Sequence, residues 1–223
     1  MQRPLRWTYV PKNCRSLLNT GEGWKVIIEG QDSCLTGGPL QHSYQLVQFH
    51  SHWGKCHKTG SEHTVDGEGF AAELHLVHWN MDLYNSVEEA LASKKGVAVI
   101  GVFFQIGKHH DELAKITDLL CEIVNKGDEC PLSKKIDPSA FFPVHDYWTY
   151  EGSLTTPPCH ESVTWILFKK PVEVSEEQLD KFKMLFSSTL KAFVNGAPIR
   201  SRVVENCRPS QPLNGRVIRE ATC

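Results

Sequence analysis

One short segment constrains the fold more than any other part of the chain: residues 48–54, QFHSHWG. It ends a longer run, 43–53, in which polar residues alternate with β-branched and aromatic ones, as they do in a strand. Because side chains of a strand alternate between two faces, His50 and His52 lie on the same face, together with Gln48. Two neighbouring imidazoles on a rigid strand supply half of a zinc site, although a solvated sheet face would show the same pattern.

A second run, 71–79 (AAELHLVHW), predicts another strand and adds a third histidine. Glu73 and His75 share one face, and they repeat the spacing of Gln48 and His50. A metal-bound imidazole usually donates its second ring N–H to a carboxylate or carbonyl group, which fixes the ring orientation. Three histidines without a fourth protein ligand are typical of catalytic zinc sites, whose open position binds water. The sequence therefore predicts a Zn²⁺ cofactor on His50, His52 and His75, with Gln48 and Glu73 as hydrogen-bond partners of the rings.

A third run, 147–158 (YWTYEGSLTTPP), completes a set of four motifs. In chain order the motifs are QFHSHWG at 48–54, SEH at 61–63, ELHLVHW at 73–79 and SLTTPP at 153–158. In these motifs and their order the chain resembles an α-class carbonic anhydrase, from about Arg6 to Ala221. Four motifs in the right order are far more specific than any one of them.

The resemblance implies a fold and an activity. The fold would be mainly β, with a large, twisted, mostly antiparallel central sheet and flanking helices, and residues 1–223 would form a single domain. The activity would be the zinc-dependent, reversible hydration of CO₂ to bicarbonate and a proton. Zinc-bound water in carbonic anhydrases is known to have a pKa near 7, so hydroxide would be available at neutral pH.

The resemblance also assigns roles to polar residues around the zinc. Thr155 would orient the zinc-bound hydroxide and pass its own proton to Glu62, and orientation of this kind contributes to rate. The backbone N–H of Thr155 and the side chain of Thr156 would meet bicarbonate, or an anionic or sulfonamide inhibitor. The carbonyl group of Asn206 would accept a hydrogen bond from one ligand histidine. Without the resemblance, Thr155 is a turn hydroxyl and Glu62 a surface charge.

CO₂ is apolar, so its site needs an apolar wall beside the metal. The positions that match the family's substrate site are Val77, Val99, Leu154, Thr155, Thr156, Val163 and Trp165. By composition alone the apolar members of this set are ordinary core residues, and some could serve both purposes.

The chain departs from the family pattern at two positions. Where many active members have a histidine that carries protons to solvent, this chain has Glu22, and Lys25 replaces a neutral polar residue. A free carboxyl group titrates near 4.3, about 2.7 units below a donor near 7, so it is a poor proton acceptor. Zinc binding is unaffected, but Glu22 is expected to limit proton export.

The remaining histidines receive other interpretations. His63 and His78 match buried structural positions of the family. His57 and its neighbour Cys56 are expected in a solvent-exposed loop rather than at a second metal. Surface positions are expected for His42, His109, His110 and His160.

A second function stays open, a catalytically weak or inactive carbonic-anhydrase-related binding protein. Relatives of that kind lack one or more zinc histidines, whereas this chain has all three, together with Glu62 and Thr155. Esterase activity, in which the same nucleophile attacks activated esters, is treated as a side reaction.

The composition and charge of the chain limit its possible binding partners and its cellular compartment. A formal net charge of −2 provides no basic stripe for nucleic acid, and no apolar run reaches membrane-span length. The chain has no linker-like tract, and we expect a monomer acting on CO₂ and bicarbonate. The eight cysteines form no Cys-x-x-Cys pair, so free thiols and a cytoplasmic location are expected.

Two observations leave a location outside the cytoplasm open. Secreted family members often carry a cysteine after the Pro-Pro pair, where this chain has Cys159. The resemblance also begins inside the family's fold, and its aromatic-rich N-terminal segment has no counterpart before Met1. A secreted or anchored form is therefore an alternative, and lower thermal stability than in a chain extended by such a segment is expected.

The rest of the chain predicts further elements. Residues 1–20 are expected to be irregular or a short strand, and strands are predicted at 24–29, 97–106 and 162–168. The ends 202–204 and 215–219 are expected to pair with each other.

Three helix starts carry capping signals. Ser86 with Glu89 predicts a capping box, as does Ser175 with Gln178. Asp111 is expected to cap a helix that reaches Val124. The apolar residues expected on the buried faces of these helices are Leu113, Ile116, Leu120, Ile123, Leu179, Phe182 and either Leu185 or Phe186.

Overall fold

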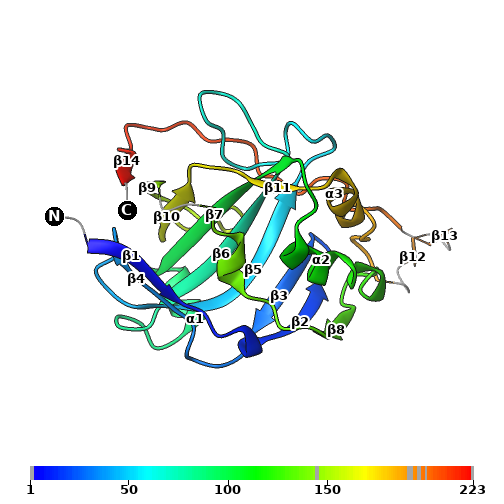
Figure 1. Cartoon of the computed structure of the whole chain (residues 1–223), viewed down its shortest axis with the longest axis horizontal. Coiled ribbons are helices and arrows are strands. Elements are labelled where there is room, and N and C mark those ends of the chain that lie inside the picture. The colour runs from blue at the N-terminus through cyan, green and yellow to red at the C-terminus, as the bar shows by residue number, and fades with distance from the viewer. Residues whose placement is uncertain (1–2, 144–145, 190–192, 195–196, 199, 222–223) are drawn as a thin grey trace.

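The computed structural model describes residues 3–143, 146–189, 193–194, 197–198 and 200–221. Within these residues a large twisted sheet dominates the molecule, with short helices at its flanks (Figure 1). The main path of the sheet runs β14 (Arg219–Ala221), β9 (Tyr147–Gly152), β10 (Val163–Phe168), β7 (Val97–Ile106), β6 (Ala72–Asn80), β5 (Tyr44–Trp53), β3 (Trp24–Ile28), β2 (Cys14–Asn19) and β8 (Glu129–Pro131). The predicted fold class is confirmed.

Other strands join this path at its margins. β1 (Arg3–Thr8) pairs with β4 (Cys34–Gly38), and β4 also pairs with β5. β11 (Val172–Val174) pairs with β7. Strands β12 (Phe193–Val194) and β13 (Ala197–Pro198) form a separate pair. Among the described strands, β10 and β11 pair with β7 in parallel, and the other pairings are antiparallel.

The helices are short. The α-helices are α1 (Val87–Leu91), α2 (Asp111–Thr117) and α3 (Glu176–Phe182), and the 3₁₀ segments are η1 (Pro11–Asn13), η2 (Leu120–Glu122) and η3 (Pro138–Phe141). The capping box of Ser175 and Gln178 at α3 is confirmed in both hydrogen bonds. At α1, Ser86 accepts from the backbone N–H of Glu89, but the Glu89 carboxylate accepts from the N–H of Asn85.

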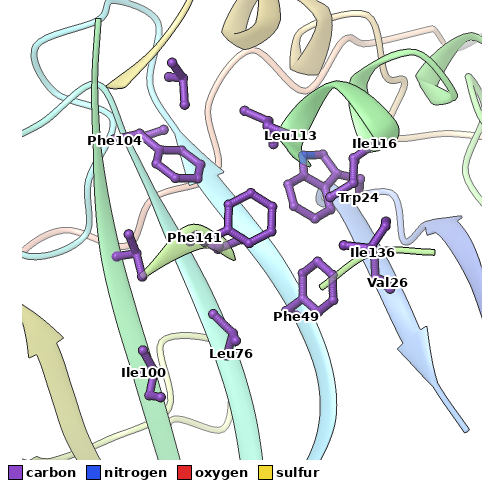
Figure 2. Packing of buried hydrophobic residues seen from close by; sticks show 14 of the residues in the cluster. Trp24, Val26, Phe49, Leu76, Ile100, Phe104, Leu113, Ile116, Ile136 and Phe141 are labelled. Carbon is purple, nitrogen blue, oxygen red and sulfur yellow. The ribbon is translucent and has the colours of Figure 1, made fainter. Parts of the chain in front are cut away.

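The main hydrophobic core lies on one face of β5, β6 and β7. Phe49, Leu76 and Ile100 project from these strands toward Phe141 of η3, and α2 closes the core with Leu113 and Ile116 (Figure 2). All of these residues are fully buried. Since side chains alternate along a strand, the histidines next to Phe49 and Leu76 are directed to the opposite face.

Two predictions about the elements are wrong. Helix α2 is capped by His110, whose Nδ1 accepts from the N–H of Leu113 at 3.2 Å, and it ends at Thr117 rather than at Val124. His110 is half-buried and stacks on Phe141 at 5.2 Å, so its predicted surface position is also wrong. The imidazole that caps the helix is therefore also stacked on an aromatic ring of the core.

The predicted pairing of 202–204 with 215–219 is wrong as well. Arg202 forms an isolated bridge with Phe186, and β14 pairs with β9. Between these contacts the chain has no helix or strand. Long-range partners that the local pattern does not encode therefore decide this region.

Candidate metal centre

The three predicted ligands are brought together by the pairing of β5 with β6. His50 lies directly opposite His75 in the antiparallel register, and His52 follows His50 on the same face. The ring centroids are 4.7 to 5.4 Å apart. One nitrogen of each ring lies within 4.8 Å of the other two, so the three side chains could hold one metal ion.

Each ring is held by an oxygen on its outer side. Nδ1 of His50 lies 2.8 Å from Oε1 of Gln48, and Nδ1 of His52 lies 3.0 Å from the carbonyl oxygen of Asn206. Nε2 of His75 lies 2.7 Å from Oε1 of Glu73. These oxygens accept hydrogen bonds, so each outer nitrogen carries the proton and each inner nitrogen carries a lone pair.

The inner nitrogens therefore fit a cation. Nε2 of His50 and Nε2 of His52 are 3.1 Å apart, and two lone pairs at that distance repel unless a positive charge lies between them. Ligands of a tetrahedral zinc ion lie roughly 3.3 Å apart, given zinc–nitrogen distances of about 2.0–2.1 Å. Burial, together with the neighbouring imidazoles, lowers the pKa of both rings and keeps them in the neutral form that binds metals.

Glu73 fixes more than one ligand. Its Oε1 also accepts from Nδ1 of His63 at 2.6 Å, while its Oε2 accepts from the backbone N–H groups of Glu62 and His63 at 3.0 and 2.9 Å. Burial raises the pKa of Glu73, but His63 and His75 outweigh burial and hold it well below the usual value. Glu73 is thus a buried anion that orients His75.

His63 and His78, which were expected at buried structural positions, both lie against oxygen atoms of the fold. Nε2 of His63 lies 2.5 Å from the hydroxyl of Tyr150, which extends the Glu73 network. His78 is fully buried on the other face of β6, between the hydroxyl of Tyr9 at 2.9 Å and the carbonyl of Ala98 at 3.2 Å. In the loop after β5, Cys56 is exposed and His57 lies 3.3 Å from Asp180 of α3.

Glu62 lies beside the three rings. Its Oε1 accepts from the N–H of Arg208 at 2.8 Å and lies 3.3 Å from Nδ1 of His52. Its Oε2 lies 4.0 Å from Nδ1 of His75, and this buried oxygen accepts no hydrogen bond within the described part of the chain. Sequence reasoning missed the contact with Arg208, because no local signal marks a bond that joins positions 146 residues apart.

A cavity of about 550 Å³ opens onto the histidines. The predicted site residues in its wall are Glu22, Gln48, His50, His52, His75, Val77, Val99, Leu154, Thr155, Thr156, Trp165 and Asn206. Glu62, Glu73 and Val163 are not in that wall. Val163 is buried in a small apolar cluster with Val99, Leu154 and Trp165.

The apolar cluster forms one side of the cavity. Its buried members lie on β7 and β10. The Trp165 ring stands against the rings of His63 and His75, with centroid distances of 4.7 and 4.8 Å. The cavity therefore places three ring nitrogens beside an apolar wall. Such a site can bind a metal ion and a small apolar molecule next to each other.

The cavity wall also carries charged and titratable side chains. Besides the ligand histidines, the titratable residues in its wall are Glu22, Lys25, Glu88 and His160. His160 is exposed, as the sequence predicted, but it also lines the cavity, which the sequence analysis did not anticipate. Its closeness in sequence to Thr155 and Thr156 was the signal that could have found it.

The fold and the site together are typical of a mononuclear metalloenzyme. A mainly β scaffold carries three histidines whose ring nitrogens face one another, beside a cavity with an apolar wall. The sequence profile of the family described as "Eukaryotic-type carbonic anhydrase" matches residues 1–222. The chain belongs to this family of enzymes, which hydrate CO₂.

Curated relatives agree with the family. "Carbonic anhydrase 5B, mitochondrial" of Rattus norvegicus is 46% identical over 224 residues, 98% of this chain and 68% of the relative. "Carbonic anhydrase 3" of Homo sapiens is 46% identical over 220 residues, covering 97% and 82%, and that of Equus caballus 47% identical over 218 residues, covering 96% and 81%. No helix among the described residues is long and apolar enough to cross a membrane.

Proposed function

We propose that the protein is a zinc enzyme that interconverts CO₂ and bicarbonate, with His50, His52 and His75 as the metal ligands. The observation that carries this proposal is the convergence of three inner nitrogens whose outer nitrogens are all bonded to oxygen acceptors. When bound, zinc lowers the pKa of water to near 7 and thereby provides the nucleophile, as is established for carbonic anhydrases.

The residues of the chain position the other reactant. Val77, Val99, Leu154 and Trp165 give CO₂ an apolar surface directly beside the histidines, and this surface excludes competing water from that side. Thr156 and the backbone N–H of Thr155 receive the product, because bicarbonate is an anion that needs donors where CO₂ needs none. Sulfonamide and anionic inhibitors are expected to use the same donors.

Thr155 and Glu62 orient the nucleophile in this proposal. Thr155 lines the cavity, and Oε2 of Glu62 is a buried acceptor without a described donor. A threonine hydroxyl that donates its one proton to this carboxylate can only accept any further hydrogen bond, so it would orient a donor that approaches from the metal side. Oε1 of Glu62 lies 3.3 Å from Nδ1 of His52 and its Oε2 lies 4.0 Å from Nδ1 of His75, and this nearness to the histidines supports Glu62 as the acceptor.

One experiment tests the proposal. The purified protein should contain one zinc ion and hydrate CO₂ in a stopped-flow assay, and Thr155→Ala should lower kcat/KM by roughly a hundredfold while zinc content stays at one. Zinc-loaded protein without hydration activity would support the catalytically inactive binding protein instead. A Thr155→Ser variant, which keeps the hydroxyl, is the matched control and should retain most of the activity.

We also propose a reducing compartment and a monomeric state. The seven described cysteines are free thiols, which suits the cytoplasm predicted from the sequence. One relative is named as mitochondrial, so cell fractionation and gel filtration of the native protein are the deciding measurements.

A further inference from the structure

The cavity must release a proton for each CO₂ that is hydrated. Addition of water to CO₂ forms one C–O bond and gives bicarbonate and one proton, and this proton has to reach solvent before the next turnover. A group in the cavity wall that accepts the proton and then gives it to a base in solution speeds this step.

The titratable groups of the wall differ in their suitability. A free carboxyl group titrates near 4.3 and a free ammonium group near 10.4, whereas free imidazole titrates near 6.5. Of these side-chain types, imidazole is therefore the one best matched to a proton donor near 7. Glu22, Glu88 and Lys25 line the same wall, but none of them carries an imidazole. Among the described residues in the wall, His160 alone combines an imidazole with a position outside the three proposed ligands.

The loop that carries His160 holds it at the cavity. Its carbonyl oxygen accepts from the N–H of Leu154 at 2.9 Å, which closes a loop that begins and ends at the cavity wall. Within this loop the N–H of Cys159 donates to the carbonyl of Thr156 at 2.9 Å. The backbone of His160 is thus fixed next to Leu154, in the apolar wall, and only a few residues from Thr155.

The ring of His160 is exposed and free to turn. No hydrogen bond or ion pair from another described side chain fixes it, in contrast to the three ligand rings. A ring that accepts a proton on the cavity side and releases it on the solvent side must be exposed to solvent and must be able to rotate.

We infer that His160 is a proton-transfer residue that carries the proton from the water in the cavity to bases in solution. The inference rests on the proposed function and names the residue that performs its last step. The proton moves from cavity water to a ring nitrogen, gives an imidazolium, and leaves from the ring to buffer, so the neutral imidazole is restored.

The test compares zinc-loaded wild type with His160→Ala and His160→Gln in stopped-flow CO₂ hydration at low buffer concentration. Both variants should lower kcat roughly tenfold or more, leave kcat/KM unchanged, and recover in added imidazole. His42→Ala is the matched control, because His42 is another partly exposed histidine that lies beside Asp82 rather than at the cavity, and its kcat should stay unchanged. Unchanged kcat in both His160 variants, or a parallel fall of kcat and kcat/KM, overturns the inference.

A second measurement does not depend on activity. Diethyl pyrocarbonate should modify His160 and His42 in the zinc-loaded protein, and benzenesulfonamide in the cavity should slow modification of His160 alone, as read by mass spectrometry. Equal rates with and without the inhibitor would show that His160 does not face the cavity and would overturn the inference. Active wild type with unaffected variants refutes His160 only, whereas zinc-loaded but inactive wild type refutes the proposed function together with it.

Discussion

Two histidines of strand β6 lie in different environments, because the side chains of a strand alternate between its two faces. His75 and His78 are three positions apart on β6, so they project from opposite faces. His75 meets His50 and His52 above the cavity, whereas His78 is enclosed between Tyr9 and Ala98. The strand period therefore assigned His75 and His78 to opposite faces of the sheet from the sequence alone.

At this scale the metal ligands can be tested individually. Replacing His50, His52 or His75 by Ala should weaken zinc binding at least a hundredfold each, because two remaining nitrogens leave the tetrahedral set incomplete. His78→Gln is the control and should bind one zinc ion per chain, as measured by atomic absorption after dialysis. Full occupancy in His75→Ala would contradict the ligand assignment.

His78 also makes stability depend on pH. Burial lowers its pKa from 6.5 to about 4, while in the unfolded chain it titrates normally. At pH values between 6.5 and about 4, His78 binds a proton in the unfolded state but not in the folded state. The stability of the folded state therefore falls as the pH falls through this range. The loss amounts to about 3 kcal/mol when the window has been crossed.

Urea denaturation of the zinc-free protein at pH 7 and at pH 5 measures the part of this loss that lies above pH 5, about 2 kcal/mol. Zinc-free protein is used because metal release would add its own pH dependence. His78→Gln should show a smaller difference between the two pH values. An equal difference in wild type and variant would assign the pH dependence to other groups.

At the scale of elements, patterns with strong local causes were predictable and long-range pairings were not. β5, β6 and β7 follow from alternation or from an apolar run, and α3 follows from its capping box. The parallel contacts of β10 and β11 with β7, and the pairing of β14 with β9, join residues far apart in sequence. Their registers depend on which strand edges remain free once the centre of the sheet has formed.

Contacts between residues far apart in sequence also limited the prediction of helix α2 and of the site. His110 caps α2 in place of Asp111, and its ring stacks on Phe141, about thirty positions further along the chain. Gln48 and Glu73 were found as ring partners because they are two positions from their histidines. The neighbours of Glu62 came from remote segments, and only the family resemblance pointed to that residue.

Gln178 links two helices and gives a prediction at this scale. Its Oε1 accepts from the backbone N–H groups of Ser175 and His110, and its Nε2 donates to the carbonyl of His110. Because Gln178 is buried, Gln178→Ala leaves the N–H groups of Ser175 and His110 without this acceptor, while the carbonyl of His110 still accepts from the N–H of Ala114. The loss should destabilise the protein by about 2–4 kcal/mol. Ser175→Ala removes one capping bond and should cost about 1 kcal/mol.

Urea denaturation of both variants ranks the two effects. Ser175→Gly is the control for the cap, since glycine at this position costs only a few tenths of a kcal/mol relative to serine. An equal loss in Gln178→Ala and Ser175→Ala would mean that the link to His110 contributes nothing. CO₂ hydration should persist in both variants, because α3 is not part of the cavity wall.

On the scale of the whole molecule, the sheet separates stability from chemistry. The core of Phe49, Leu76 and Ile100 fills one face of β5–β7, and the histidines and the cavity occupy the other. The core is large, apolar and independent of the metal site, so the fold does not need zinc to bury its hydrophobic residues. The site in turn gains precision from strands whose position is fixed by the packing beneath them.

Removal of zinc tests this separation. The zinc-free protein should keep its far-ultraviolet circular dichroism and unfold cooperatively, but at a lower temperature, because a ligand that binds only the folded state stabilises it by about 4 kcal/mol at a thousandfold excess over Kd. Returning zinc should restore the original Tm. His75→Ala, with its incomplete ligand set, should melt at nearly the same temperature with and without zinc. A zinc-free protein that is unfolded at 25 °C would mean that the metal belongs to the structural core of the sheet.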